Sequence, residues 1–383
     1  MTALGLASGW RQWVGNDLPA PTASSQKRTL SLWPEYDVDY LSRYDAHSLN
    51  LRDDMQALTY RITKHTIPGW VPFHHKEPRG IAYETDTHFV HFFGKDKGLW
   101  VVSTGLTVTQ AKSGTLGEWI DRTFGAIDVE PIHCDVGHTV HGVWRPGLYY
   151  SDEILQGLSA TVYDLRVAEQ ALLLLIQRLD ELLHFVEPSS STLQTHSHKA
   201  RELLILACTE VENAWMEYLR IANVATPARG DFRTNDYVKL LGPLHLTEYQ
   251  ISLPRYAAVA AICPFDSWSA TAPTKSLPWY DAYNKTKHDR RSNFADATLW
   301  NCLQAVAANL VLFSVRFGPF PLFHGGGTLA AYCNQLFTIE LRNCLPSSFY
   351  APKLNLPSNQ REDLICFGSQ ELIEQRIVDP LTL

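Results

Sequence analysis

Between residues 155 and 183 the chain repeats apolar side chains at alternating intervals of three and four residues. The positions are Leu155, Leu158, Val162, Leu165, Glu169, Leu172, Ile176, Leu179 and Leu183, of which only Glu169 is charged. Such a spacing predicts an α-helix with a single apolar seam. Ser151 is a suitable N-cap and Pro188 ends the pattern, so we expect one helix over 149–188, about 50 Å long. Either this helix links domains and pairs with a second copy, or it packs against its own chain.

The composition limits the class of protein to which the chain belongs. With 383 residues, 45% hydrophobic and 19% charged, it can bury a large core and is expected to form about two or three units. The net charge of −7 argues against coating nucleic acid through bulk electrostatics but is compatible with a local basic site. Seven scattered cysteines without a Cys-x-x-Cys pair favour a reducing compartment over a disulfide framework. Because neither a signal peptide nor a run of ~18 apolar residues is visible, we expect a cytoplasmic protein that does not associate with a membrane.

The first 148 residues are expected to form a small mixed α+β domain, to which we assign a sensing or recognition role. Strand-like runs occur at residues 58–62, 89–93, 99–102, 127–134 and 139–144. The segment Gly94-Lys95-Asp96-Lys97-Gly98 joins two of them and predicts a hairpin, because its glycines supply the backbone freedom of a turn. Residues 17–28 are rich in proline and serine, which is typical of a loop.

A linker at residues 188–196 precedes a region of helical periodicity. Helices are expected at about 199–222, at about 237–241, from Pro278 onward, and at 299–315. Pro278 can open a helix because proline is tolerated where the first backbone N–H has no partner. The tail from Gly318 contains three successive glycines and several prolines, so it either wraps the preceding domain or becomes ordered on binding. The predicted fold class is α+β, with an N-terminal mixed α/β domain at 1–148, a long heptad helix at 149–188, a helical bundle at 194–317 and a loop-rich tail at 318–383.

The stretch from Trp279 to Arg290 holds the residues best suited to chemistry. Four side chains recur at spacings of four, four and three, so that they share one helical face: Tyr280, Asn284, His288 and Arg291. Histidine can accept and return a proton near neutral pH, and an amide can orient a phosphate. Cations that can stabilise negative charge lie within seven residues of one another, at Lys285, Lys287, Arg290 and Arg291. The alternative interpretation is a solvated helix face with a structural histidine bonded to Asp289 or Glu210.

Two other groups of residues match no recognisable site. The spacing of His133, Cys134, His138 and His141 fits no zinc pattern, and on alternating strands these side chains would split between faces. The three glycines after His324 lack the lysine and the hydroxyl residue of a phosphate loop. We therefore expect neither a metal nor a cofactor.

Four segments of the helical region carry a family likeness. They are Ala200–Trp215 (ARELLILACTEVENAW), Pro264–Trp268 (PFDSW), Leu277–Arg290 (LPWYDAYNKTKHDR) and Phe294–Phe313 (FADATLWNCLQAVAANLVLF). Together they resemble the HEPN-like domains of prokaryotic proteins, over about a third of the chain, roughly residues 199–317. The resemblance implies a helical bundle that commonly dimerises, in proteins of phage defence or toxin–antitoxin systems. Active members of that superfamily are metal-independent endoribonucleases whose motif is arginine, a polar residue that is often asparagine, three to five further residues, and histidine.

On that motif Asn284 matches the polar position and His288 the histidine, with three residues between them. Tyr283 stands where the arginine is expected, and Lys287 or Arg291 is the candidate to replace its charge. The resemblance then implies attack of a ribose 2′-hydroxyl on the adjacent phosphate, with His288 as general acid or base and without a metal. The implied catalytic residues are Asn284, His288, Lys287 and Arg291, and the implied RNA contacts are Lys285, Arg290 and Tyr280.

RNA is accordingly the implied substrate. The implied assembly is a homodimer or higher homo-oligomer in which two copies face each other across one cleft, with a partner defence protein as a further candidate to complete the site. A second interpretation belongs to another class: a catalytically inactive HEPN-like module for dimerisation, RNA binding or protein interaction, in which His288 is structural. The absent arginine favours the inactive module, whereas the basic face and the spacing of Asn284 and His288 favour the nuclease.

Overall fold

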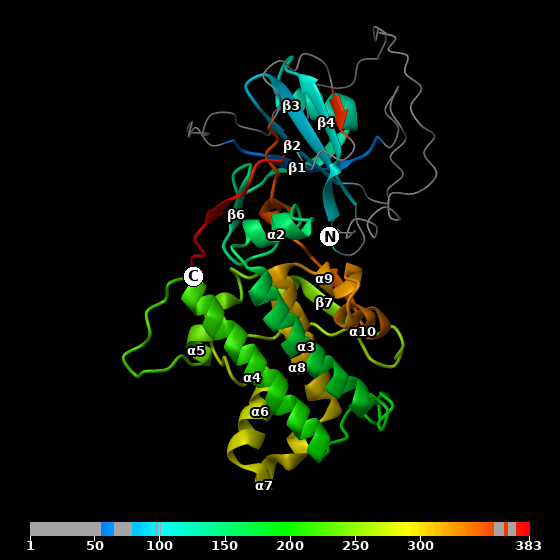
Figure 1. Cartoon of the computed structure of the whole chain (residues 1–383), viewed down its shortest axis with the longest axis vertical. Helices are drawn as coiled ribbons and strands as arrows, with labels where there is room; N and C mark the ends of the chain where they lie inside the picture. Colours follow the sequence, from blue (N-terminus) through cyan, green and yellow to red (C-terminus); the bar gives the residue numbers. More distant parts are fainter. Residues whose placement is uncertain (1–54, 65–78, 96–98, 100, 356–363, 367–372) are drawn as a thin grey trace, which may run out of the picture. The chain divides into compact units, whose positions relative to one another are not determined.

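A computed structural model of the chain describes residues 55–64, 79–95, 99, 101–355, 364–366 and 373–383 (Figure 1). The chain divides into two compact units, Met1–Arg52 and Asp53–Leu383, and the first lies outside the described residues. The loop predicted at residues 17–28 belongs to that first unit and also lies outside the described residues.

Four of the predicted strand-like runs, at residues 58–62, 89–93, 99–102 and 127–134, belong to one antiparallel sheet in the order β5-β1-β2-β3-β4-β9. Its members are β1 (Leu58–Ile62), β2 (Arg79–Glu84), β3 (His88–Lys95), β4 (Val101–Ala111), β5 (Ala126–Pro131) and β9 (Leu364–Cys366). The run predicted at 139–144 overlaps β6 (His138–Val140), which lies in a separate two-stranded sheet. Antiparallel pairing of β3 with β4 confirms the predicted hairpin (Figure 1). The last strand, β9, comes from the C-terminal tail and pairs with β4. The sheet therefore includes one strand from outside residues 1–148.

Each face of this sheet carries its own apolar cluster. Helix α1 (Leu116–Phe124) covers one face, where Trp119 stacks on Phe89 with ring centroids 5.2 Å apart. The alternation predicted for β1 is confirmed, since it places Tyr60 and Ile62 in this cluster. The opposite face packs against residues that follow the helical part, including Phe349.

One histidine is buried among the aromatic side chains under α1. The His91 ring is fully buried, lies 3.9 Å from the Phe124 ring (centroid to centroid) and shares a hydrogen bond of 2.7 Å between its Nδ1 and the Tyr60 hydroxyl. Burial lowers the pKa of His91 well below its ordinary value, because an imidazolium in this environment would lose its hydration without gaining a counter-ion. The imidazole is therefore neutral in the folded protein at physiological pH.

This buried imidazole predicts an acid-sensitive sheet. Below about pH 6.5 His91 is protonated in the unfolded chain but stays neutral in the folded chain. The free energy of unfolding therefore falls by about 1.4 kcal/mol for each pH unit of acidification. The free energy of unfolding in urea, measured at pH 7 and pH 5.5, should drop more in the parent than in a His91→Asn variant, whose amide does not titrate. An equal drop in the two proteins would show that His91 is protonated in the folded state.

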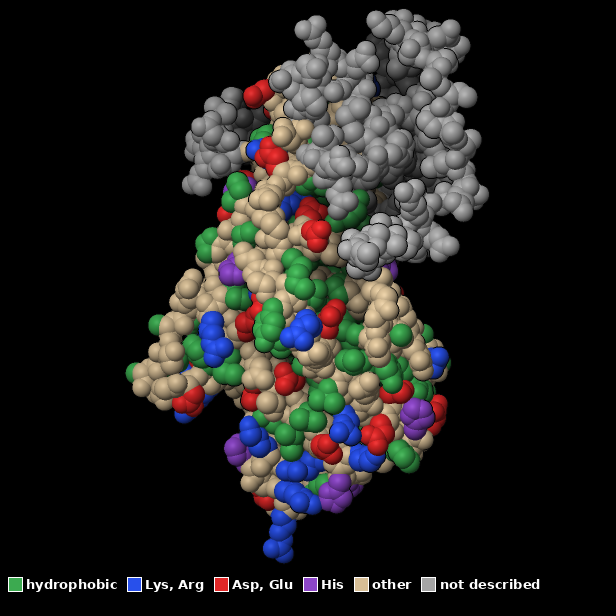
Figure 2. Space-filling model, viewed as in Figure 1, with side chains coloured by type: hydrophobic (Ala, Val, Ile, Leu, Met, Phe, Trp, Pro, Cys, Tyr) green, Lys and Arg blue, Asp and Glu red, His purple; other side chains and the backbone are tan. Residues whose placement is uncertain are grey.

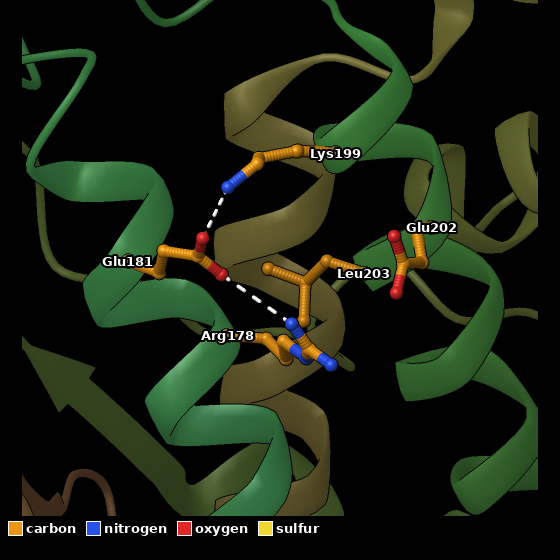
Figure 3. A pocket seen from close by; sticks show the side chains of 5 residues that line it. All are labelled: Arg178, Glu181, Lys199, Glu202 and Leu203. Atoms are coloured by element: carbon orange, nitrogen blue, oxygen red, sulfur yellow. Dashed lines mark hydrogen bonds and ion pairs between the residues drawn. The ribbon is translucent and has the colours of Figure 1, made fainter.

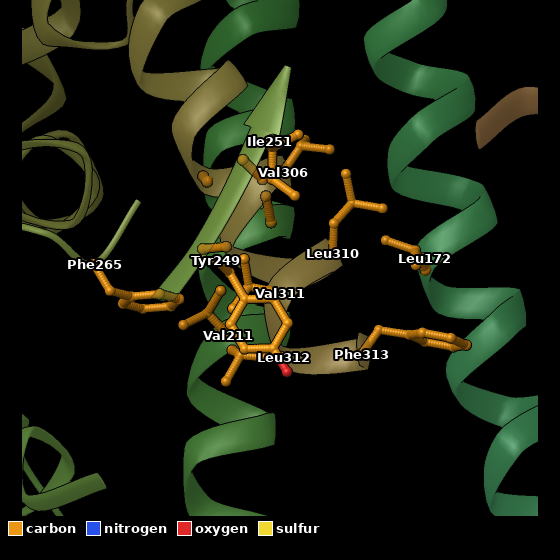
Figure 4. Packing of buried hydrophobic residues seen from close by; sticks show 14 of the residues in the cluster. Leu172, Val211, Tyr249, Ile251, Phe265, Val306, Leu310, Val311, Leu312 and Phe313 are labelled. Atoms are coloured by element: carbon orange, nitrogen blue, oxygen red, sulfur yellow. The ribbon is translucent and has the colours of Figure 1, made fainter. Parts of the chain in front are cut away.

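The helical part is built around α8 (Leu299–Phe317), against which α3, α4 and α6 pack. Figure 4 shows Val306 and Leu310 of α8 among side chains of the neighbouring elements, such as Leu172 of α3 and Ile251 of β7. By length and composition α8 alone among the described helices suits a membrane span, yet 78% of that window is buried inside the protein. Such burial is typical of a core helix.

The remaining elements complete this part of the fold. They are α2 (Ser151–Gly157), α3 (Val162–Leu183), α4 (His198–Ile221), α5 (Thr234–Tyr237), η2 (Val238–Leu240), η3 (Leu246–Glu248), β7 (Tyr249–Ser252), α6 (Pro278–His288), α7 (Arg290–Asn293), η4 (Phe294–Asp296), α9 (Pro321–His324), α10 (Thr328–Leu336), β8 (Thr338–Leu341) and η5 (Pro346–Ser348). The helices predicted at about 199–222, from Pro278 and at 299–315 are confirmed as α4, α6 and α8.

The prediction of one continuous helix over 149–188 is wrong. Two helices, α2 and α3, are separated by a turn in which Ser159 adopts a left-handed φ of 51°, a value that interrupts a right-handed helix. Ser151 is the first residue of α2 and not its cap. Thr161 begins α3 through a capping box with Asp164. The second half of the seam, from Leu172 onward, is buried against α4, α8 and α10, so the seam packs on its own chain.

The C-terminal tail wraps the preceding elements, as one of the two predicted alternatives has it. Strand β8 pairs with β7, and β10 (Ile377–Asp379) pairs in parallel with β6 (His138–Val140). Beside β10 the Arg376 side chain is fully buried and donates to Glu153 and to two backbone carbonyls. The tail thus packs on β6 and α2, the elements that lie in the sequence between the sheet and the helical part.

Candidate functional site: the cationic end of α6

Helix α6 begins as the sequence predicts and ends earlier than predicted. Pro278 occupies its first turn, and Trp279 anchors it by donating to the Pro264 carbonyl at 3.0 Å. The helix stops at His288, where Asp289 leaves helical geometry at φ −137°, ψ 83° and caps the short helix α7. Arg291 therefore belongs to α7, and the predicted common face of Tyr280, Asn284, His288 and Arg291 is broken after His288.

The aromatic residues of α6 point inward to a carboxylate on α4. The Tyr280 hydroxyl donates to Glu212 at 2.5 Å, and the Tyr283 hydroxyl donates to the other oxygen of Glu212 at 3.1 Å. Burial and the neighbouring carboxylate raise the pKa of Tyr280. Its side chain is 3% exposed, so Tyr280 is not available to the RNA contact expected of it.

Tyr283 binds Lys287, the lysine that we expected among the catalytic residues. The Lys287 ammonium donates to the Tyr283 hydroxyl at 2.7 Å and lies 4.9 Å from the centre of its ring. The hydrogen bond to Tyr283 raises the pKa of Lys287, which stays protonated. The position that the HEPN motif assigns to arginine is therefore occupied by a buried tyrosine bonded to Glu212 and Lys287.

Asn284 and His288 lie one turn apart at the outer side of α6. The Asn284 amide is half-buried and donates to the Tyr280 carbonyl at 3.1 Å, within its own helix. His288 is exposed at the last position of α6. The Lys285 ammonium, next to Asn284, pairs with Asp281 at 2.7 Å. The imidazole is thus accessible to a ligand and is not enclosed by apolar side chains.

The first turn of α4 adds residues that the sequence did not assign to the site. The Arg201 guanidinium donates to the Thr286 carbonyl at 3.0 Å, which ties α4 to the last turn of α6. Nearby, the Arg290 guanidinium lies 3.4 Å from the His198 Nδ1. The His198 ring also packs on Phe294, with centroids 4.8 Å apart. These contacts join residues about ninety positions apart, so spacing along the chain gave no signal for them.

Together these residues form a surface that we name the cationic end: His198, Arg201, Lys285, His288, Arg290 and Arg291. Figure 2 shows Lys, Arg and His side chains gathered at the lower end of the molecule, over α6 and α7. Arg290 and Arg291 are exposed, and the nearest carboxylate in sequence, Asp289, is committed to capping α7. The chain as a whole has a net charge of −7, so this cluster of cations is a local region of positive charge on an acidic protein.

Two hollows of the described surface lie away from the cationic end. A small pocket of about 30 Å³ between α3 and α4 is lined by charged side chains, with Glu181 bonded to both Arg178 and Lys199 (Figure 3). A larger groove of about 400 Å³ opens between α3 and α4 over α8. Neither is lined by Asn284 or His288, and the His288 side chain is exposed at the surface.

This arrangement can bind a polyanion along an open face and offers one accessible imidazole with a half-buried amide beside it. Comparison with known proteins adds no family name to the site: no protein family, no curated protein and no solved structure matches this chain.

Proposed function

We propose that the helical part is a HEPN-like module that binds RNA through the cationic end. The observation that carries this proposal is the exposure of Arg290, Arg291 and His288 beside α4, on a protein that is otherwise acidic. Arginine and lysine on an open surface suit phosphate oxygens, because each contact releases a condensed counter-ion. The spacing of Asn284 and His288 resembles the HEPN motif and supports the HEPN-like part of the proposal. On the same ground we propose a role in phage defence or in a toxin–antitoxin system.

The proposal predicts a strong and salt-dependent loss of binding when two of these charges are reversed. Arg290→Glu/Arg291→Glu should weaken binding of a labelled single-stranded RNA at least about tenfold in fluorescence anisotropy, since two phosphate contacts become repulsive. The slope of log K against log salt should become shallower by about 1.4, or roughly 0.7 for each lost contact.

A matched control keeps the same charge change away from the site. Lys239 and Arg255 are exposed on other elements of the described surface, so Lys239→Glu/Arg255→Glu alters the net charge equally. This control should retain most of the affinity. Equal weakening by both double variants would mean that only net charge matters, and the cationic end would not be the binding surface.

The second candidate function is the metal-independent endoribonuclease, and the exposed His288 one turn from Asn284 favours it. In that reaction a ribose 2′-oxygen bonds to the adjacent phosphorus while the bond to the 5′-oxygen breaks. The products are a 2′,3′-cyclic phosphate and a 5′-hydroxyl. His288 would accept the 2′-hydroxyl proton or protonate the leaving oxygen. Because Tyr283 and Lys287 are bonded to each other, Arg290 or Arg291 would have to stabilise the phosphorane charge.

Incubation with RNA in EDTA separates the two functions. Cleavage by the parent that yields cyclic phosphate ends, and that disappears in His288→Ala, is the result expected of the nuclease. The control is His184→Ala, an exposed histidine at the end of α3, which should cleave like the parent. RNA that is bound but not cut would leave the catalytically inactive module as the function, with or without a partner defence protein.

A further inference from the structure

The outward side of α3 is unusually apolar for a solvated helix. Among the described residues, most of the exposed large hydrophobic side chains belong to α3 or follow it directly. They are Val162 (71% exposed), Tyr163 (65%), Val167 (45%), Leu174 (46%) and Phe185 (74%). A solvent-exposed helix face normally carries charged and polar residues. Contiguous exposed apolar side chains mark interaction surfaces.

Part of this apolar surface forms a regular row. Its members recur at spacings of four, four, three and four, which places them on one side of the helix; we name Tyr163, Val167, Ala171, Leu174 and Arg178 the outer stripe. The outer stripe differs from the buried seam that contains Leu172 and Ile176. Helix α3 therefore carries, beside the buried seam, a second and largely apolar row that the described residues leave partly exposed.

The outer stripe borders the larger groove. Tyr163, Val167 and Ala171 form part of the α3 wall of that groove, Ala214 lies on the α4 wall, and Phe313 comes from α8. The groove has a volume of about 400 Å³. The same surface thus presents projecting apolar side chains and an adjoining hollow, which is what a self-complementary two-fold interface needs.

The charges along α3 select the orientation of a second copy. Asp164 and Arg178 each lie seven residues from Ala171, or about 10.5 Å along the helix axis. An antiparallel pair of α3 helices that cross at Ala171 places each Asp164 carboxylate, which also accepts from Thr161 in the capping box of its own helix, opposite Arg178 of the other copy. A parallel pair would place like charges opposite each other instead. Arg178 is half-exposed, and its 3.4 Å contact with Glu181 in its own chain is a surface pair that contributes little.

The carboxylates that line the groove also favour the antiparallel orientation of the second copy. Glu210 and Glu217 line the groove from α4, and Asp164 lines it from α3. The one cation among the lining residues is Arg316, which is paired with Glu217 at 3.1 Å. An occupant that brings a cation is favoured, and Arg178 of a second copy supplies it.

From these observations we infer that the chain forms a two-fold dimer in which the outer stripes of two α3 helices pack antiparallel across Ala171. The small side chain of Ala171 allows the helix backbones to approach, and Val167 and Leu174 of each copy cover the apolar rim of the other. The inference does not depend on RNA binding or on catalysis.

This dimer differs from the assembly implied by the family likeness. The end of α3, close in sequence to the start of α4 and its His198, lies twelve residues beyond Ala171, or about 18 Å. In an antiparallel pair the two α3 ends are therefore about 36 Å apart. Each cationic end would act by itself, and the two His288 side chains would not share one cleft.

A pair of valine variants on one helix tests the interface in the full chain. In sedimentation velocity the parent should be a dimer, and Val167→Glu should raise the dimer dissociation constant at least about 100-fold, because the new carboxylate would be buried at the interface. The control is Val162→Glu, since Val162 is more exposed than Val167 but does not line the groove; it should remain dimeric. Circular dichroism should show the same helix content in all three proteins.

A cysteine on the proposed axis tests the register. Two copies of Ala171→Cys should form one disulfide when an added oxidant such as oxidised glutathione takes up the two electrons, and the two thiol protons are released. Ala257→Cys, on an exposed turn, should give no such species on a non-reducing gel. A monomeric parent overturns the inference. So does a dimer that resists Val167→Glu and does not cross-link at residue 171, because its interface would lie elsewhere.

Discussion

Replacement of Arg376 by alanine is expected to lower the free energy of unfolding by about 3–5 kcal/mol. The arginine side chain is fully buried, and its guanidinium lies 2.5 Å from a Glu153 carboxylate that is itself 12% exposed. The same guanidinium donates to the Gly147 carbonyl at 2.9 Å and to the Ala351 carbonyl at 2.7 Å. Without it, a largely buried carboxylate and two carbonyls lose their donors at once. Urea unfolding followed by circular dichroism measures the loss.

A double variant distinguishes the missing charge from the missing volume. Glu153→Gln/Arg376→Met removes both charges and keeps an unbranched side chain, so it should recover a large share of the stability lost in Arg376→Ala. Arg166, which is exposed on α3, provides the surface control, and Arg166→Ala should change stability by less than about 0.5 kcal/mol. A loss below about 1 kcal/mol in Arg376→Ala would show that water replaces the guanidinium without difficulty.

Gly147→Ala should be at least as damaging, with a loss of about 4 kcal/mol or more. A Cβ at this position would lie 1.9 Å from the Tyr350 carbonyl oxygen, which belongs to the backbone and cannot rotate away. The residue also has a φ of 111°, where side chains other than hydrogen are strained. We expect little folded protein, measured as soluble yield and as the thermal midpoint.

The control for this substitution is a glycine in open space. Nothing lies within 4 Å of a Cβ built at Gly242, and its φ is not in the left-handed region. Gly242→Ala should therefore leave the thermal midpoint within a few degrees of the parent. If Gly147→Ala folded as well as Gly242→Ala, the backbone near Tyr350 would have to be free to move.

The elements predicted well are those with local signals. Helix α4 has an apolar row and a serine cap at Ser197, and α6 has a proline in its first turn, so neither depends on distant residues for its recognition. The β3–β4 hairpin likewise follows from two strand-like runs and the glycine-bounded segment between them. The break between α2 and α3 also had a local signal, the Thr161–Asp164 capping box, which the regular apolar spacing obscured.

The candidate site was predicted only in part because its contacts are long-range. The bond between Tyr280 and Glu212 spans 68 residues, and the approach of Arg290 to His198 spans 92. Spacing on one helix placed Tyr280 on the same face as His288 but could not show that a carboxylate on α4 draws the tyrosine inward. The same limit explains why the strand added by the tail was missed.

The pairing of β10 with β6 sets an order of events during synthesis. His138 and Asp379, which bond at 3.1 Å in that pair, are 241 residues apart. At about 5–20 residues per second, the ribosome adds residue 379 roughly 12–48 seconds after residue 138. Until then the nascent chain contains Glu153 without Arg376, its ion-pair partner, and β6 without β10, its partner strand. Emergence of β10, and not emergence of the first strands, is therefore the moment at which this junction can close.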